Sequence, residues 1–339
     1  MLSSREKVNQ VFSRKNTSEK VFWTGHPNDA TVSIYSKEWN IEPTREAIYS
    51  YLEDDCRWFM ADGGYKHPEG LAALNPSYGV TRNTLSAEGC FSEAETLEDI
   101  EAYPWPDVQY CDFSEIYAQI DKHSDKMVFT GMWSCFFHIV ADFFGMENYF
   151  IKMYENPKLV EAVTEKVVDY YVAANDKFFS GLGDRADVMF FGNDLGTQLD
   201  LFVSPDNFRK FILPSVKRII SVGKKYNKKI MMHSCGSIYR IIPDLIEAGV
   251  DILHPIQAQA EGMSAFDLQK YKKDLAFVGG IDAQSFLVNA NPQQIEEEVE
   301  RVRSILGPGI VISPSHEEIL PNVPPANMLA MSRMAHRYS

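Results

Sequence analysis

Solid apolar runs that alternate with longer segments of helical period constrain the fold of this 339-residue chain more than any other feature. Such runs are apolar at almost every position, as expected for parallel strands covered on both faces. Six runs follow one another from residue 127 onward, and two earlier candidates bring the number to eight. In chain order they are Val21–Thr24, Arg57–Ala61, Met127–Trp133, Val188–Asn193, Lys229–His233, Ile252–Ile256, Leu275–Gly279 and Ile310–Ser313. The pattern predicts an α/β protein with a (β/α)8 barrel of the TIM type.

The segments between these runs carry signals for where helices begin and end. Gly249 is placed to end a helix just before the run at residue 252. Pro214 lies inside a predicted helix and predicts a kink there. Residues 62–106 contain no clear element, so we expect loops or a cap beside the barrel. Three predicted helix starts join a polar cap to proline at the first helical position, and these are Asn156-Pro157, Ser204-Pro205 and Asn291-Pro292.

Length and composition limit the classes of protein to consider. Because α/β barrels often use this many residues as one unit, we predict a single domain over residues 1–339, with an N-terminal extension over about residues 1–20. The 47 acidic and 33 basic residues give a net charge of −14, which disfavours nucleic acid and anionic membranes as partners. Five irregularly spaced cysteines and the lack of a signal peptide or a long apolar span predict reduced thiols and a cytoplasmic protein.

Polar residues follow most of the predicted strands at their C-terminal ends. Barrel enzymes place their chemistry on the loops that follow the strands, so these residues are candidates for a site. Strand ends are also exposed and therefore often polar without any function, which is an equally good explanation for any single residue. The set consists of His26, Asn28, Asp62, Ser134, Asn193, Asp194, His233, Cys235, Gln257, Asp282, His316 and Glu317.

The pair His233 and Cys235 is the strongest local signal for chemistry. In extended backbone, residues i and i+2 point to the same side, so an imidazole and a thiolate could bind one metal ion. Zinc needs at least one more protein donor, and the end of the last strand offers His316 or Glu317. The alternative is a hydrogen-bonded histidine beside a buried thiol.

Several segments in the second half of the chain together carry a family resemblance. They are His233-Ser-Cys-Gly-Ser-Ile238, Ile242-Pro-Asp-Leu-Ile-Glu-Ala-Gly-Val-Asp-Ile-Leu-His-Pro-Ile-Gln257, Gly279-Gly-Ile-Asp282, Pro314-Ser-His316 and Pro324-Pro-Ala-Asn327. From about residue 193 onward the chain resembles the uroporphyrinogen decarboxylase superfamily. This superfamily includes porphyrinogen decarboxylases and zinc-dependent methyltransferases that work with corrinoid proteins.

The resemblance favours the methyltransferase branch. The decarboxylases carry an arginine-bearing motif near the N-terminus that grips the carboxylates of the porphyrinogen, whereas the corresponding stretch here, Phe22 to Ala30, contains no arginine. The methyltransferases carry a His-x-Cys pair and a later third ligand, usually cysteine. His233 and Cys235 match the pair, but His316 and Glu317 stand where the third ligand is expected.

The resemblance implies a zinc-dependent methyltransferase that moves a methyl group between a corrinoid, held by a partner protein, and a thiol or similar acceptor. His233, Cys235 and Glu317 are the predicted metal ligands, with His316 as the alternative to Glu317. Asp194 and His316 are predicted to be catalytic. Asn193, Gln257 and Asp282 are predicted to bind substrate, and a homodimer is the implied assembly.

Two other functions fit the same residues. The first is a metal-free, decarboxylase-like lyase that acts on a smaller carboxylated substrate, with His316 as proton donor. The second is a non-catalytic protein that binds a corrinoid protein or a small ligand at the barrel mouth.

Overall fold

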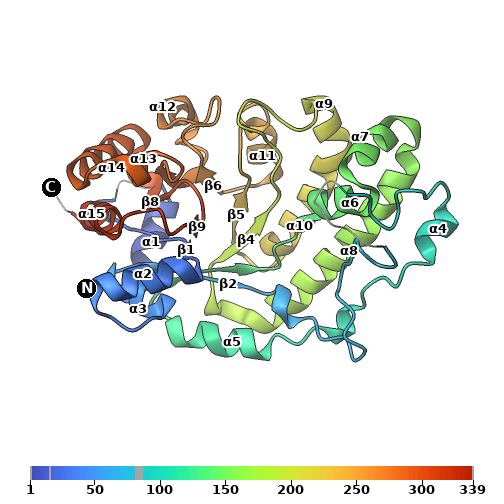
Figure 1. The fold of residues 1–339 in the computed structure, drawn as a ribbon, viewed down its shortest axis with the longest axis horizontal. Helices are drawn as coiled ribbons and strands as arrows, with labels where there is room; N and C mark the ends of the chain where they lie inside the picture. The colour runs from blue at the N-terminus through green and yellow to red at the C-terminus, as the bar shows by residue number, and fades with distance from the viewer. Residues whose placement is uncertain (1, 15–16, 81–86, 338–339) are drawn as a thin grey trace.

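Seven parallel strands form a curled sheet in which each strand pairs with its neighbours in chain order. The computed structural model describes residues 2–14, 17–80 and 87–337. In Figure 1 the sheet lies at the centre, with α14 and α15 on one side and α6, α7 and α8 on the other. The strands are β2 (Cys56–Met60), β3 (Met127–Gly131), β4 (Val188–Gly192), β5 (Lys229–His233), β6 (Ile252–Ile256), β7 (Ala276–Ile281) and β8 (Ile310–Pro314). The predicted TIM-type α/β fold is thereby confirmed.

One of the eight predicted strands, over residues 21–24, does not form as a regular strand. An extended segment lies there instead, between β8 and β2. Phe22 forms an isolated parallel bridge with Ile312. On one side Trp23 donates its N–H to the Ile312 carbonyl at 3.0 Å, and on the other Asp55 donates its N–H to the Phe22 carbonyl at 3.1 Å. No regular ladder forms because the N–H groups of Phe22 and Thr24 bond the carboxylates of Asp55 and Asp54 instead of strand carbonyls.

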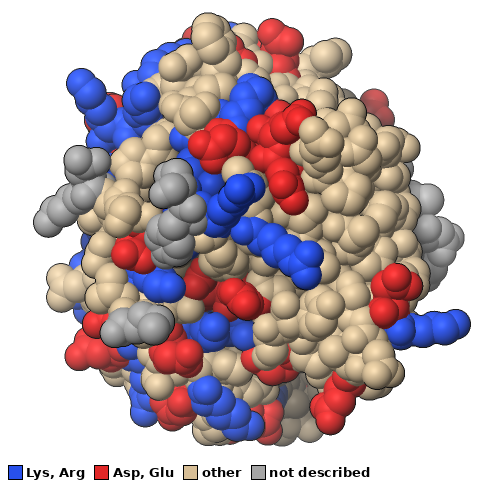
Figure 2. All heavy atoms as spheres, turned by 90° about the vertical axis from the view of Figure 1, so that its left-hand side faces the viewer, with Lys and Arg blue, Asp and Glu red and all other residues tan. Residues whose placement is uncertain are grey.

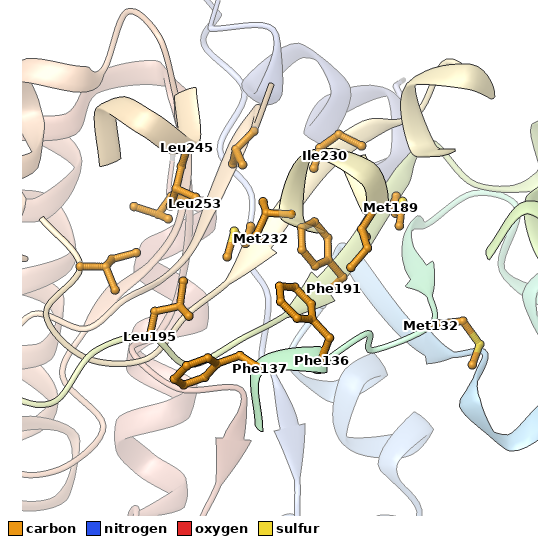
Figure 3. Packing of buried hydrophobic residues seen from close by; sticks show 14 of the residues in the cluster. Met132, Phe136, Phe137, Met189, Phe191, Leu195, Ile230, Met232, Leu245 and Leu253 are labelled. Carbon is orange, nitrogen blue, oxygen red and sulfur yellow. The ribbon is translucent and has the colours of Figure 1, made fainter. Parts of the chain in front are cut away.

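Helices cover the outer face of the sheet, and the longest is α8. Side chains of alternate residues on β4 and β5, such as Met189, Phe191 and Met232, pack in one cluster with Phe136 and Phe137 of α6 (Figure 3). The helices are α1 (Ser4–Phe12), α2 (Asp29–Trp39), α3 (Arg45–Tyr51), α4 (Leu97–Glu101), α5 (Ser114–Ile120), α6 (Phe136–Phe144), α7 (Met146–Glu155), α8 (Pro157–Leu182), α9 (Pro205–Asn207), α10 (Leu213–Lys225), α11 (Ile242–Ala248), α12 (Ala265–Leu268), α13 (Phe286–Asn289), α14 (Pro292–Leu306) and α15 (Pro325–His336).

A second cluster fills the interior of the curled sheet and is capped by α1. It joins Val8, Val11 and Phe12 of this helix to inward-facing strand residues such as Phe129 and Phe190. Arg5 fastens α1 at the N-terminal ends of the strands, because its N–H groups bond the carboxylate of Asp187, just before β4. The N-terminal extension therefore closes one end of the barrel and leaves the opposite end for a site.

The predicted helix boundaries are largely reproduced. Asn291 forms a capping box with Gln294 at the start of α14, and Gly249 ends α11 with a φ of 102°. A five-residue π-helical turn directly precedes α10, where Pro214 lacks the N–H for a regular helical bond. Asn156 makes no capping bond. Its amide donates instead to the carbonyl of Glu95, in the segment that packs beside α7 and α8.

A two-stranded sheet lies beside the end of β8 and holds the segment that follows it. β1 (His26–Pro27) pairs in parallel with β9 (Glu318–Ile319). Gly25 precedes β1 with a φ of 85°, and a Cβ there would collide with the carbonyl of Glu317. Glycine is thus required for the close approach that positions residue 317.

Charged side chains of both signs are interspersed on the face that carries the two termini (Figure 2). Ion pairs also join neighbouring elements, such as Arg45 of α3 with Asp29 of α2 at 2.6 Å. No helix within the described residues is long and apolar enough to cross a membrane.

Candidate metal centre

His233 ends β5 at the centre of the candidate site. Its side chain is 2% exposed and points into the barrel, where its ring lies 5.1 Å from that of Trp133 and 5.0 Å from that of His254. Because these neighbours enclose the ring, its two nitrogens face fixed sets of partners. Each set consists of groups that can bind a metal ion.

The Nε2 atom of His233 faces a thiol and a carboxylate. It lies 3.4 Å from the Cys235 sulfur and 3.0 Å from Oδ1 of Asp194, which follows β4. The N–H of Cys235 donates to the same Asp194 oxygen at 2.8 Å. The turn after β5 is therefore tied to the turn after β4, and the predicted same-side placement of His233 and Cys235 is observed.

The Nδ1 atom of His233 faces a different pair of groups. It lies 3.0 Å from Nδ1 of His254 and 3.4 Å from Oε2 of Glu317. The Glu317 side chain is 17% exposed, and its Oε2 is buried with no hydrogen-bond partner among the described residues. Cys235 and Glu317 are both close to the ring, but they approach opposite nitrogens.

The charges of the site stabilise one another. Burial lowers the pKa of His233, but Glu317, Asp194 and Cys235 outweigh it and hold this pKa well above its usual value. Burial raises the pKa of Cys235, whereas His233 and His316 lower it, and the net result is a pKa below the usual thiol value. His233 likewise outweighs burial at Asp194 and keeps the pKa of that carboxyl low. His233, Cys235 and Asp194 thus form an electrostatically coupled set.

His316 joins the site from the loop after β8. Its Nδ1 accepts the backbone N–H of Glu318 at 3.0 Å, so its Nε2 carries the ring proton and can donate it to a partner such as the Cys235 sulfur. The imidazole is close enough to Cys235 to lower the pKa of the thiol. A cleft of about 400 Å³ opens on this side, lined by His316, Gln284 and Asn322. A second cleft of about 580 Å³ lies beside Glu317 and is walled by Trp58 and Phe59.

The three predicted substrate-binding residues brace loops around the site. Asn193 accepts the N–H of Phe137 at 2.9 Å and donates to the carbonyl of Ser134 at 3.0 Å. Gln257 accepts the N–H of Gly236 at 2.5 Å. Their contact with substrate stays a prediction, as does that of Asp282.

Asp282 has the same bracing arrangement. It accepts from the N–H groups at the start of α13, including that of Phe286 at 2.8 Å. Its carboxylate therefore accepts hydrogen bonds from the backbone N–H groups at the start of α13.

The donor set on the Nε2 side fits a zinc ion. Zinc binds thiolate, imidazole and carboxylate, and tetrahedral coordination would separate a sulfur and a nitrogen ligand by about 3.6 Å. The 3.4 Å between the sulfur of Cys235 and Nε2 of His233 is close to this separation. Asp194 adds an oxygen on the same side, whereas Glu317 lies beside the other nitrogen. Of the predicted ligands, His233 and Cys235 are therefore arranged for one ion without rearrangement.

Two histidines of the site escaped the sequence analysis. His254 touches His233 from β6, and His138 of α6 acts electrostatically on Asp194. A signal for His254 was present, because it lies two residues after Ile252 in an apolar strand and so shares its inward face. His138 carries no such signal in the sequence, because only the folded position of α6 brings it near Asp194.

Comparisons with known proteins concern the family and the fold of the chain. A family model described as uroporphyrinogen decarboxylase (URO-D) matches residues 85–338. A methyltransferase from Methanosarcina mazei is similar in structure, with a TM-score of 0.67 and 16% identity over 99% of this chain and 98% of that one. A protein assigned as a vitamin-B12-independent methionine synthase from Listeria monocytogenes has a TM-score of 0.48 and 12% identity, over 93% of this chain and 95% of that one. No curated protein sequence matches this chain.

Fold and site thus define a TIM-type α/β protein with a histidine–cysteine centre at the C-terminal ends of its strands. The chain belongs to the uroporphyrinogen decarboxylase (URO-D) family, whose model covers most of its length. The family resemblance expected from the sequence is confirmed.

Proposed function

We propose that this protein is a zinc-dependent methyltransferase that moves a methyl group between a corrinoid and a thiol acceptor. The observation that carries the proposal is the convergence of His233 Nε2, the Cys235 sulfur and an Asp194 oxygen at the C-terminal ends of the strands. The similarity in fold to a methyltransferase agrees with it. We further propose that a partner protein supplies the corrinoid, and that the working assembly is a homodimer.

His233 and Cys235 would hold the zinc ion, with Asp194 as the third donor. Glu317, predicted from the sequence as that donor, would reach a metal on Nε2 only after a change in its side chain or in the ring of His233. Bound zinc supplies Lewis acidity, which lowers the pKa of a coordinated thiol so that its sulfur is nucleophilic at neutral pH.

The remaining residues would orient the acceptor and stabilise its sulfur. His316 would donate its Nε2–H to the acceptor sulfur and stabilise it as a thiolate, because its Nδ1 accepts the Glu318 N–H and its ring proton is therefore on Nε2. The proton that the thiol loses on binding zinc would pass to solvent. The sulfur then attacks the methyl carbon of a methylcorrinoid. A carbon–sulfur bond forms, and the cobalt–carbon bond breaks with its electron pair left on cobalt. Gln257 and Asp282 would hold the loops that shape the acceptor pocket.

The metal-free lyase is less well supported by the clefts. A lyase that acts on a small carboxylated substrate needs a cation that is free to pair with the substrate carboxylate. Two arginines line the cleft beside Glu317, but Arg57 pairs with Glu46 at 2.7 Å and Arg45 with Asp29 at 2.6 Å. Their charges are already neutralised within the chain.

Metal analysis and a spectroscopic assay test the proposal. We expect about one zinc ion per chain, and we expect methylcobalamin to be demethylated in the presence of a suitable thiol. His233→Ala should abolish both, whereas the exposed Lys166→Ala should change neither. Protein grown with ample zinc that contains almost none, and that a His233→Ala change leaves unaffected, would contradict the proposal. Binding of methylcobalamin without demethylation by any thiol would support the non-catalytic alternative.

A further inference from the structure

We propose that His254 is a positioning residue that fixes the tautomer and orientation of His233. In this arrangement His254 accepts the Nδ1–H of His233 and thereby presents the Nε2 lone pair of His233 to a metal ion. The inference rests on the metal site of the proposed function and identifies a residue that shapes it. A histidine that binds a metal commonly donates its second ring N–H to a fixed acceptor.

The backbone of β6 directs His254 into the barrel. Ile252 packs in the interior cluster and Leu253 in the outer one, so His254 faces inward again. The pairing of β6 with β7 shifts register between Leu253 and Ile256. This irregularity spans His254 and Pro255. Ile256 beyond it packs in the outer cluster, while the imidazole of His254 lies beside that of His233.

The contact between the two imidazoles is a hydrogen bond with one proton. The two Nδ1 atoms lie 3.0 Å apart, and only one of them can carry hydrogen. Glu317 Oε2 lies 3.4 Å from Nδ1 of His233, and its negative charge favours the proton on His233. Nδ1 of His254 is then the acceptor, and Nε2 of His233 is left facing Cys235 and Asp194.

The surroundings of His254 suit a fixed, neutral imidazole. The residue is fully buried, and its ring lies 5.2 Å from those of both Trp23 and Phe190. Its Nε2 has no hydrogen-bond partner among the described residues. The aromatic rings hold the imidazole in place with its Nδ1 toward His233, and the contact with His233 is the only hydrogen bond that its ring makes among the described residues.

Two substitutions of His254 separate positioning from other roles. Asparagine can place its amide oxygen near the position of the histidine Nδ1, so His254→Asn keeps an acceptor for His233. Leucine has a comparable bulk but no acceptor. We expect His254→Leu to weaken zinc binding about 10- to 100-fold, and His254→Asn to stay within about threefold of wild type.

Zinc affinity is measured on the metal-free full-length protein by competition with a chromophoric chelator. Cobalt(II) spectra provide a second readout, because the ligand-field bands change when the imidazole rotates. Thermal unfolding of the metal-free variants controls for a loss of fold. If leucine destroys the fold, His254→Asn together with His254→Gln, whose amide reaches the Nε2 position instead, provides the same comparison.

The outcomes distinguish the inference from the function on which it rests. Equal zinc affinity in wild type and both variants would overturn the positioning role. Equal loss in His254→Asn and His254→Leu would also overturn it, because it would make His254 a direct metal ligand together with His233 and Glu317. Failure of the wild type to bind zinc would refute the proposed function itself.

Discussion

At the scale of single residues, the site depends on the two nitrogens of one imidazole. His233 faces Cys235 and Asp194 with Nε2, and His254 and Glu317 with Nδ1. A metal ion can use only one of these sides with the ring as placed. Two carboxylates that look equivalent in the sequence therefore have different expected roles, Asp194 as a ligand and Glu317 as a charge that holds the proton on Nδ1.

This division of roles predicts an order of effects for two conservative substitutions. Asp194→Asn should weaken zinc binding more than Glu317→Gln does. For Glu317→Gln we expect a loss of zinc affinity of about 10- to 100-fold. Both amides keep the size of the carboxylate, so packing is nearly unchanged. Chelator competition on the metal-free variants measures the two affinities. The reverse order would assign Glu317 to the metal, as the sequence alone suggested.

At the scale of elements, α1 is held by charge as well as by apolar packing. Arg5 and Asn9 both donate to the Asp187 carboxylate, at 2.6 Å and 3.1 Å. Burial raises the pKa of Asp187, but these donors outweigh it and leave the pKa below its usual value. The carboxylate is thus more stable as an anion in the folded protein than in the unfolded chain.

The sign of this shift predicts how stability depends on pH. The contribution of Asp187 is complete above its unfolded pKa of about 4 and is lost as pH falls through its lower folded pKa. Asp187→Asn should cost about 1–3 kcal/mol at neutral pH, and the difference from wild type should shrink below about pH 4. Urea denaturation at several pH values measures it.

A matched control uses a carboxylate of the same kind at the surface. Asp206 pairs with Arg209 at 3.3 Å, and its side chain is 95% exposed. Asp206→Asn should change the unfolding free energy little at any pH. A pH-independent cost for Asp187→Asn would show that packing, rather than charge, fastens α1.

At the scale of the whole molecule, the barrel has two apolar layers with the site at one end of the inner one. The inner cluster runs from α1 through Phe129 and Phe190 to Trp58 and Trp133. Phe190 also touches the rings of His233 and His254. The floor of the site is therefore part of the core, and its stability and its geometry depend on the same side chains.

Truncating Phe190, which lies beneath the site, should destabilise the fold. Phe190→Ala should lower the free energy of unfolding by about 3–5 kcal/mol, because it leaves a cavity inside the barrel. Phe266→Ala is the control, since this side chain is 70% exposed on α12 and should change stability by less than about 0.5 kcal/mol. Chemical denaturation monitored by circular dichroism compares the two. Similar small effects would mean that the interior relaxes to fill the space.

Local sequence patterns were enough to predict most of the fold and, within the site, the pair His233 and Cys235. These patterns are the runs that are apolar at almost every position, the helix starts that join a polar cap to proline, and the glycine C-cap. Each pattern extends over only a few residues, so it could be recognised without coordinates. The His233 and Cys235 pair followed in the same way from the two-residue period of extended backbone. The segment at residues 21–24 resembled a strand, but the N–H groups of Phe22 and Thr24 bond the side chains of Asp55 and Asp54.

What the sequence determined by itself is the order of elements, the family and the identity of the central histidine and cysteine, because these depend on short-range periodicity and motif. Only the tertiary structure decided which side of the His233 ring each carboxylate faces, and that His254 lies against Nδ1. These relations join side chains 21 to 84 positions apart. Their geometry depends on strand register, on the irregularity in the pairing of β6 with β7 and on the loops that follow β4 and β8, none of which a local pattern encodes.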